Sequence, residues 1–197
     1  MTRGVTTVRS SLIVLAGGGA RRLGGRDKPG LVRGERTLLR SVIDAGAEAG
    51  AQPVVVVGPR RAGVEGVVFV SEEPPGAGPV PALRRGLAEV AAPWVVVLAA
   101  DLPFLRQAHV GALLRAAASG GAGAVLADDA GRPQWLAGCW RTAALRAALD
   151  GYAGDSLRGL LGPLEPAMLR LDPAPGEPPP WLDCDTPEDL ERARGWT

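Results

Sequence analysis

A glycine-rich segment that also carries basic side chains is the part of this 197-residue sequence best suited to chemistry. It reads Leu15-Ala16-Gly17-Gly18-Gly19-Ala20-Arg21-Arg22-Leu23-Gly24-Gly25-Arg26-Asp27-Lys28 and directly follows a short apolar stretch. Its glycines allow the backbone to bend and to bring N–H groups close to a ligand. Such N–H groups, together with arginine and lysine cations, form a cradle for an anion, and a polyphosphate is the obvious candidate.

Two familiar phosphate-binding loops do not match this segment. A dinucleotide fingerprint counted from Gly17 would need glycine at the position of Arg22. A P-loop has the spacing of Gly19 and Gly24, but Gly25 follows where a lysine is required. The competing interpretation is a flexible surface loop in a chain rich in glycine and arginine. Its position after the first predicted strand favours a binding loop, because α/β sheets bind ligands at the carboxyl ends of their strands.

Lys28 is the one lysine of a chain that otherwise uses arginine at its basic positions and contains no asparagine. This bias is typical of a GC-rich coding sequence, in which most basic positions default to arginine. An ammonium group is a compact point charge, whereas a guanidinium group is a wide fork. The lone lysine therefore indicates a site where the fork would not serve.

Asp101 follows another apolar stretch and precedes Pro103. At the end of a buried strand, its carboxylate would face the glycine-rich segment. Polyphosphate chemistry usually needs Mg²⁺, which prefers carboxylate oxygen and water and is often held by only one or two protein carboxylates. Asp101 is therefore a candidate metal ligand, and an aspartate in a turn or at a helix N-cap is the structural alternative.

The elements that must position these residues are apolar strands alternating with amphipathic helices. Strands are predicted over 11–16, 53–58, 66–70, 94–100, 123–127, 134–139 and 167–171. Helices are predicted over 37–50 with Thr37 as N-cap, 79–92, 107–119, 142–149 and 186–194, and a proline-rich surface loop over 171–180. Near-continuous apolar strands imply a sheet covered on both faces. The predicted fold class is α/β, with three layers around a mostly parallel, doubly wound sheet.

Length and composition bound the remaining possibilities. The chain suits a single domain over 1–197, with residues 1–10 as a loose lead-in. A net charge of +1 argues against nucleic-acid or acidic-membrane partners. The apolar runs are far shorter than the roughly 20 residues of a membrane span, and no secretory signal is recognisable, so a cytoplasmic protein is expected. Cys139 and Cys184 lack the spacing of a disulfide framework or a metal site, which favours buried small hydrophobes.

The glycine-rich segment resembles the signature of the nucleotidyltransferases of the molybdenum cofactor guanylyltransferase type, the molybdopterin nucleotidyltransferase family. That signature opens with L-A-G-G and continues with R-[ML]-G before a lysine. The matching residues are Leu15, Gly17, Gly18, Arg22, Gly24 and Lys28. The sequence from 100 to 103 is similar to the family's metal-binding aspartate motif, and 182–190 is similar to its N-x-[ND]-T-P-E-[DE]-L ending. The resemblance extends from Ser11 to Arg194.

The resemblance implies a fold, an activity and its small molecules. The fold is that of the nucleotide-diphospho-sugar transferases, which is Rossmann-like. The activity is the Mg²⁺-dependent transfer of GMP from GTP to the phosphate of molybdopterin, which releases pyrophosphate and gives a guanine dinucleotide cofactor. Candidate protein partners are a molybdoenzyme or a protein that delivers the cofactor.

Carried over residue by residue, the resemblance also implies the site. The implied catalytic residues are Lys28, Arg22 and Asp101. The implied nucleotide-binding residues are Leu15, Ala16, Gly17, Gly18, Gly19, Arg21, Gly24, Lys28, Glu73, Gly78 and Asp101. The implied metal ligands are Asp101 and Asp183; a surface aspartate is the alternative for Asp183, which stands where many relatives have asparagine.

Residues 131–138 resemble the family's acceptor-side segment, although Pro133 and Gln134 stand in the opposite order. Trp135 or Trp140 could cover a pterin, and a place in the core is the alternative for each. His109 is expected at an ordinary helix position. Two other functions stay open: a sister enzyme that uses CTP or makes a sugar nucleotide, because the loop reads phosphates rather than the base, and a non-catalytic nucleotide-binding domain.

Overall fold

A seven-stranded sheet forms the centre of the protein, in a computed structural model that describes residues 8–17, 30, 32–33, 36–173 and 175–183. The strand order is β5-β4-β1-β6-β8-β7-β9. The strands are β1 (Ser10–Leu15), β4 (Ala51–Val57), β5 (Val68–Val70), β6 (Trp94–Ala99), β7 (Gly123–Ala127), β8 (Pro133–Arg141) and β9 (Ala167–Arg170). Within this sheet only β8 runs against the others. A separate hairpin joins β2 (Val32–Arg33) to β3 (Arg36–Thr37).

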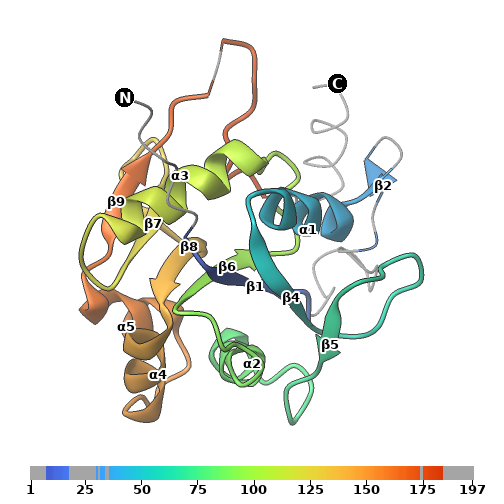
Figure 1. The fold of residues 1–197 in the computed structure, drawn as a ribbon, viewed down its shortest axis with the longest axis vertical. Coiled ribbons are helices and arrows are strands. Elements are labelled where there is room, and N and C mark those ends of the chain that lie inside the picture. Colours follow the sequence, from blue (N-terminus) through green and yellow to red (C-terminus); the bar gives the residue numbers. More distant parts are fainter. Residues whose placement is uncertain (1–7, 18–29, 31, 34–35, 174, 184–197) are drawn as a thin grey trace.

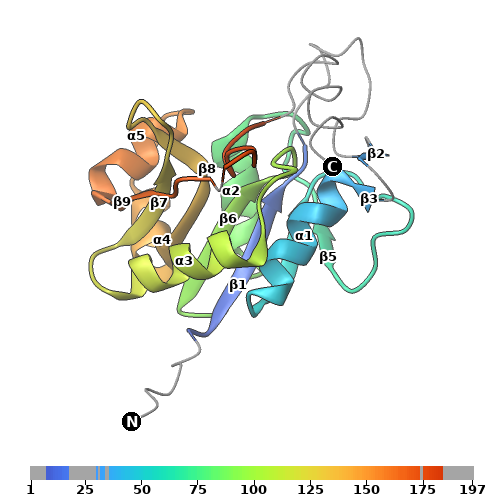
Figure 2. The same cartoon turned by 90° about the horizontal axis from the view of Figure 1, so that it is seen from above.

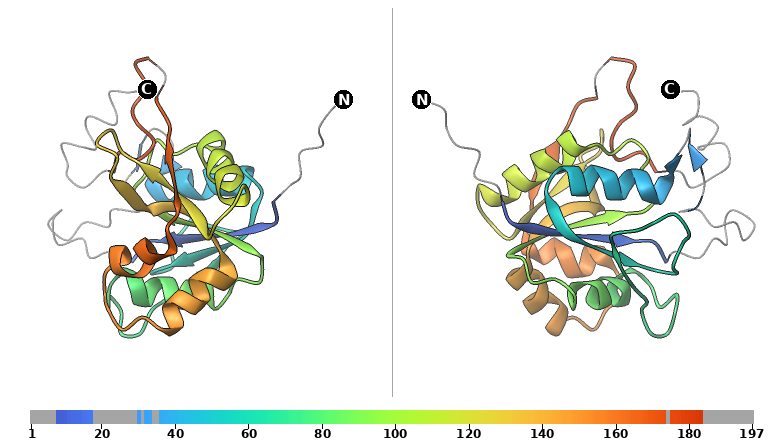
Figure 3. Two further views of the ribbon diagram at one scale, coloured as in Figure 1. Left: turned by 90° about the vertical axis from the view of Figure 1, so that its left-hand side faces the viewer. Right: turned by 45° about the vertical axis from the view of Figure 1, so that its right-hand side comes forward.

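Helices cover both faces of the sheet (Figures 1 and 3). On one face lie α1 (Leu38–Glu48) and α3 (Gln107–Ala118). On the other lie α2 (Pro79–Leu87), α4 (Thr142–Asp150) and α5 (Leu157–Leu161), followed by the short 3₁₀ helix η3 (Gly162–Leu164). The predicted three-layer, mostly parallel, doubly wound sheet is confirmed.

The apolar run of β1 shows why both faces need a cover. Leu12 and Val14 are fully buried against the α1–α3 layer, and Ile13 is fully buried against the α2–α4 layer. Side chains of a strand alternate between the two faces, so a continuous apolar run can be satisfied only when each face carries a layer. Among the described residues, no helix has the length and apolar character needed to cross a membrane.

The direction of winding reverses at β1. From β1 the chain passes through α1 to β4 on one side of β1, then returns through α2 to β6 on the other side. Figure 2 shows β1 and β6 side by side, with α1 in front of them and α2 behind. In open α/β sheets such a reversal opens a crevice beyond the carboxyl ends of the strands, where ligands bind.

Local sequence signals explain the helix ends that were predicted correctly. The Thr37 hydroxyl accepts a hydrogen bond from the Arg40 N–H at 3.2 Å, which confirms Thr37 as the N-cap of α1. Residues 171–173 and 175–180 form no helix or strand, as expected of a proline-rich loop. The helix predicted over 186–194 lies outside the described residues.

Three expectations about the elements need correction. The lead-in predicted over 1–10 is too long, because Ser10 belongs to β1 and Val8 packs against the core. Helix α2 ends at Leu87 rather than at residue 92, because the next residues turn and bury Val90. Helix α5 was not predicted, since five residues are too few for a periodic pattern; its signal is the Ser156 cap, whose hydroxyl accepts from the Gly159 N–H at 3.1 Å.

Two arginines link α2 and α4 reciprocally. The Arg84 guanidinium in α2 donates to the Leu149 carbonyl near the end of α4 at 2.7 Å. The Arg146 guanidinium in α4 donates to the Leu87 carbonyl at 3.3 Å and also to the Val90 carbonyl, just beyond α2. Each helix therefore satisfies carbonyl groups that the other leaves open at its carboxyl end.

His109 fixes the start of α3. Its Nδ1 accepts a hydrogen bond from the Arg106 N–H at 3.1 Å, which is the capping-box contact usually made by glutamate or glutamine. Burial of the ring lowers the pKa of His109 from its ordinary value of 6.5; the nearby Arg106 charge lowers it further, against an opposing effect of Glu177. The folded protein therefore favours the neutral ring.

We expect the free energy of unfolding to fall as the pH drops below about 6.5, because the unfolded chain then takes up a proton that folded His109 resists. The loss should level off once the pH passes below the folded pKa. Glutamine also accepts from an N-cap N–H but does not titrate, so His109→Gln should remove this contribution. Urea unfolding of the wild type and of His109→Gln, each at neutral pH and at about pH 5, measures this contribution to the free energy of unfolding. An equal acid sensitivity in the two would contradict the assignment.

Candidate functional site

A cavity of about 520 Å³ lies at the carboxyl ends of β1 and β6, where the winding reverses. Its walls come from widely separated parts of the chain: the end of β1, the turn before α2, the end of β6, the first half of β8 and the segment 181–183. The described residues that line it are Leu15, Ala16, Gly17, Glu72, Gly76, Gly78, Pro79, Ala82, Ala99, Ala100, Asp101, Leu102, Pro133, Gln134, Trp135, Leu136, Ala137, Leu157, Trp181 and Asp183. This volume suits a small-molecule ligand.

Backbone hydrogen bonds hold the strand ends that form the cavity floor. The Ala16 N–H donates to the Val57 carbonyl at 2.8 Å, and the Ala100 N–H donates to the Leu15 carbonyl at 3.1 Å. These bonds continue the parallel pairing of β1 one residue beyond its end. The glycine-rich segment therefore leaves the sheet from a fixed point next to Asp101.

Gly58 allows this point to form, although sequence reasoning did not single it out. Its backbone has φ of +147°, and a Cβ at this position would lie 2.8 Å from the Ala16 carbonyl carbon. A side chain at residue 58 would therefore collide with the backbone that begins the glycine-rich segment. Gly17 is also closely packed, because a Cβ there would lie 3.3 Å from Glu72 Oε1.

Of the two consecutive glutamates before α2, Glu72 lines the cavity and the predicted Glu73 does not. Glu72 lines the cavity, is only 5% exposed, and accepts a hydrogen bond from the Gly76 N–H at 2.9 Å. Glu73, the predicted nucleotide ligand, is exposed and lies in a second hollow together with Arg84 and Tyr152. Glu72 also borders the second hollow, whereas Glu73 does not line the cavity, so the residue that lines the cavity is the neighbour of the one predicted.

Asp101 and Asp183 line the same cavity although 82 positions separate them in the sequence, from 101 to 183. Carboxylate oxygens suit Mg²⁺, which one or two protein carboxylates hold when water and substrate phosphates complete its shell. The described residues contain no group of three or more histidine, cysteine, aspartate or glutamate side chains that could hold a metal. Asp101 and Asp183 are thus two described carboxylates of the cavity that could take part in holding such an ion.

Charge at the cavity also bears on its ligand. The described lining residues include three carboxylates, from Glu72, Asp101 and Asp183, and no lysine or arginine. Carboxylates alone would repel a polyphosphate. A phosphate ligand here would need cations from elsewhere. The glycine-rich segment begins at this cavity with Leu15–Gly17, and its basic residues lie outside the described ranges.

An irregularity in β8 shapes the opposite wall. Val125 pairs with Gly138, but the next residue of β7, Leu126, pairs with Gln134. The chain of β8 therefore advances by four residues where β7 advances by one. Bulges of this kind redirect side chains and are frequent next to active sites. As a result, the consecutive residues 133–137 all border the cavity.

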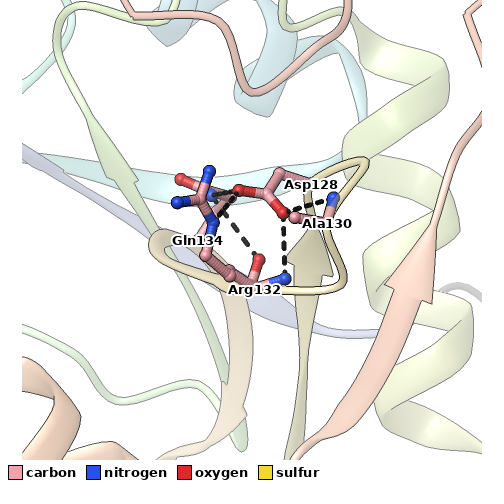
Figure 4. Close-up of polar contacts among 4 residues, drawn as sticks. All are labelled: Asp128, Ala130, Arg132 and Gln134. Carbon is pink, nitrogen blue, oxygen red and sulfur yellow. Dashed lines mark hydrogen bonds and ion pairs between the residues drawn. The ribbon is translucent and has the colours of Figure 1, made fainter.

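Asp128 organises the turn that leads into β8 (Figure 4). Its carboxylate accepts from the backbone N–H groups of Ala130 and Arg132, both at 2.9 Å, and from Arg132 Nε at 2.8 Å. It also accepts from Gln134 Nε2 at 3.2 Å. The Arg132 N–H and guanidinium and the Ala130 N–H hold the pKa of Asp128 below its usual range, although burial opposes them. Asp128 is therefore ionised at neutral pH.

The tryptophans divide between the core and the cavity. Trp140 is fully buried in the core, and Trp135 lines the cavity while packing against the α2–α4 layer. Trp181 also lines the cavity, which was not predicted because a single tryptophan in a proline-rich loop gives no periodic signal. Cys139 is buried as expected, and burial raises the pKa of its thiol to about 12, so it stays uncharged. Cys184 lies outside the described residues.

A protein-family model described as the MobA-like NTP transferase domain matches residues 12–168. The chain belongs to this family. It is 41% identical over 126 residues to a probable molybdenum cofactor guanylyltransferase from Opitutus terrae; the match spans 61% of each chain, less than two thirds of that relative. It is 33% identical over 205 aligned positions to the molybdenum cofactor guanylyltransferase of a Bradyrhizobium species, which covers 98% of this chain and 95% of the relative.

The fold of this MobA-like domain recurs in solved nucleotidyltransferases. The structure of 2-C-methyl-D-erythritol 4-phosphate cytidylyltransferase from Thermus thermophilus superimposes with a TM-score of 0.70 at 24% identity. The match covers 95% of this chain and 98% of that chain. The nucleotidyltransferase fold implied by the sequence resemblance is thereby confirmed, and so is membership of an NTP transferase family.

The described structure brings together part of the predicted site of the MobA-like domain. The predicted residues that line the cavity are Leu15, Ala16, Gly17, Gly78, Asp101 and Asp183. The predicted residues that lie outside the described ranges are Gly18, Gly19, Arg21, Arg22, Gly24 and Lys28. Gln134 and Trp135 from β8 add a second wall, and Trp181 from the segment 181–183 also lines the cavity.

Proposed function

We propose that this MobA-like domain transfers GMP from GTP to the phosphate of molybdopterin, in molybdenum cofactor biosynthesis. An oxygen of the molybdopterin phosphate forms a bond to the α-phosphorus of GTP. The bond from that phosphorus to the bridging oxygen of the β-phosphate breaks, and pyrophosphate leaves with the electron pair. The product is a guanine dinucleotide cofactor, which a molybdoenzyme or a delivery protein would receive.

The observation that carries this proposal is the convergence of four distant segments on one cavity. The ends of β1 and β6 were predicted from the residue pattern, and the Gly78 turn and Asp183 were implied by the family resemblance. All four border the same space. The cavity lies at the reversal point of a doubly wound sheet, where such folds bind nucleotides. The names of the relatives support guanylyl transfer to the molybdenum cofactor as its use.

The two walls of the cavity suit two substrates. The β1 side, with Leu15–Gly17 and the Gly78 turn, would receive the nucleotide, because its backbone is open to a close approach of phosphates. The β8 side, with Trp135, would receive the heterocycle of molybdopterin by stacking, and Trp181, which also lines the cavity, could add a second aromatic face. Asp101 stands between them, since β6 lies between β1 and β8.

The chain's own groups would act mainly by positioning and by stabilising charge. Backbone N–H groups of Gly17–Gly19 would hold the β- and γ-phosphates, while Arg22 and Lys28 would offset the charge that accumulates on the leaving pyrophosphate. Asp101, with Asp183 as a second carboxylate, would hold Mg²⁺. The bound ion would supply further positive charge next to the reacting phosphates.

Thermal unfolding with Mg²⁺ and each of GTP, CTP, ATP and UTP tests the donor. A ligand at about 100 times its Kd adds about 2.7 kcal/mol to the free energy of unfolding. Of the four nucleotides, we therefore expect only GTP to raise the Tm clearly. Pyrophosphate release with GTP and molybdopterin then tests transfer. Selective stabilisation by CTP, or by another nucleotide, would replace the guanylyl assignment with that of a sister enzyme. GTP binding without pyrophosphate release would favour a non-catalytic nucleotide-binding domain.

A further inference from the structure

The side-chain amide of Gln134 is held at its nitrogen end by the protein itself. Its Nε2 donates to Asp128 Oδ2 at 3.2 Å and to the Arg132 carbonyl at 3.5 Å. Both amide hydrogens are therefore used within the chain, and Figure 4 shows the amide nitrogen turned toward the Asp128 carboxylate. Gln134 nevertheless borders the cavity, from the irregular part of β8.

The chemistry of Asp128 decides which end of that amide can face it. An ionised carboxylate only accepts hydrogen bonds, whereas the two ends of a glutamine amide differ, one donating and the other accepting. Turning the Gln134 oxygen toward Asp128, which is 7% exposed, would place two acceptors against each other at a partly buried contact. The amide nitrogen must face Asp128, and the carbonyl oxygen is directed to the other side.

We infer that Asp128 is a positioning residue, which makes Gln134 present a hydrogen-bond acceptor to the cavity and so select an N–H donor on the heterocycle of the acceptor substrate. This inference rests on the proposed function. The relevant substrate is the acceptor, because Gln134 lies on the β8 wall beside Trp135, across β6 from the end of β1.

The chemical class of the ligand follows from this acceptor oxygen. A pterin carries lactam and amino N–H groups, which can donate to the Gln134 oxygen. A heterocycle with a carbonyl at the same place would meet two opposed oxygens, and its desolvated acceptor would find no partner. Because the amide is uncharged, the selection is by donor against acceptor rather than by charge.

One substitution changes the orientation without removing the turn. Asp128→Asn keeps the side-chain oxygen that accepts from the Ala130 and Arg132 N–H groups. It replaces the other oxygen by an amino group, to which Gln134 must now turn its own oxygen, so the cavity receives Nε2 instead. Gln134→Ala removes the amide altogether. Arg132→Gln is the matched control, since it removes the ion pair of a side chain that is 78% exposed but leaves the Asp128–Gln134 contact.

The test is a double-mutant cycle on the binding of molybdopterin in the absence of GTP. Quenching of tryptophan fluorescence measures the Kd of each variant. We expect Asp128→Asn and Gln134→Ala each to raise the Kd for molybdopterin about tenfold, the usual effect of losing one buried hydrogen bond. In the Gln134→Ala background, Asp128→Asn should cause no further loss. Arg132→Gln should change the Kd by less than about twofold, and the Kd for GTP should not change in any variant.

Three results would overturn the inference. One is a loss from Asp128→Asn that persists in the Gln134→Ala background, which would indicate a merely structural role. Another is an unchanged Kd for molybdopterin in Asp128→Asn, and the third is a rise in the Kd for GTP. Failure of the proposed function gives a different result. If the wild-type protein binds molybdopterin but releases no pyrophosphate with GTP, the proposed transfer is wrong, and the binding cycle still tests the role of Asp128. A wild-type protein that binds no molybdopterin would overturn both.

Discussion

Replacing Lys28 by alanine should slow pyrophosphate release by a factor of about 10² to 10³, the usual cost of removing one preorganised charge-stabilising group. The described walls of the cavity contribute three carboxylates and no basic side chain. The negative charge of a triphosphate must therefore be offset by groups beyond these walls, and Lys28 is the one ammonium group of the chain. Single-turnover rates with saturating GTP, Mg²⁺ and molybdopterin measure the effect.

The matched control is Lys28→Arg, which keeps the charge and changes its shape. We expect this variant to be impaired as well, because a planar fork does not replace a compact ammonium group at a fitted site. A reduction in kcat with little change in the Kd for GTP would place the effect in the transition state. Normal turnover of Lys28→Ala would remove Lys28 from the mechanism, and normal turnover of Lys28→Arg would make the lone lysine an accident of composition.

Asp101→Asn should abolish Mg²⁺-dependent transfer while leaving the fold intact. Asparagine keeps the size of aspartate but removes the negative charge with which a hard cation is held. The strand that ends before Asp101 is stabilised by the buried apolar residues 95–98, which the substitution does not touch. Pyrophosphate release over a range of Mg²⁺ concentrations, together with the Tm, separates a lost metal ligand from a lost fold.

Asp150→Asn is the matched control for this substitution, because Asp150 is an exposed carboxylate at the end of α4, outside the cavity lining. It should leave both activity and Tm unchanged. Asp183→Asn measured alongside would show whether a second carboxylate takes part, by a higher Mg²⁺ requirement. Full activity of Asp101→Asn with Mg²⁺ would make the metal assignment wrong.

The predictable parts of the fold are those in which one sequence pattern has one structural solution. The run around Leu12–Val14 can be buried only within a sheet covered on both faces, and Thr37 can cap only the helix that follows it. The position of Asp101 at a strand end was predictable for the same reason. No sequence pattern predicts that Asp101 and Asp183 line the same cavity, and only the family resemblance suggested this.

The unpredictable parts depend on small differences in chain path. Glu72 and Glu73 have the same chemistry, and only the local path of the chain decides which one lines the cavity. The irregular pairing of β8 gives no local signal, because Gln134 and its neighbours also read as an ordinary strand. The role of Asp128 likewise follows from its hydrogen bond with Gln134, six residues away. From the sequence alone, residues 128–134 could equally be an ordinary surface turn.

The reciprocal arginine contacts between α2 and α4 have a consequence for how the protein opens locally. Neither helix can fray at its carboxyl end without exposing carbonyl groups that the other had satisfied. The two helices therefore form one cooperative unit of partial unfolding. Because α2 begins at the Gly78 turn and α4 leads toward Leu157, both of which line the cavity, we expect a ligand that fills the cavity to stabilise this unit as a whole. The acceptors are carbonyl groups rather than carboxylates, so this mechanical link should persist at high ionic strength, where surface ion pairs weaken.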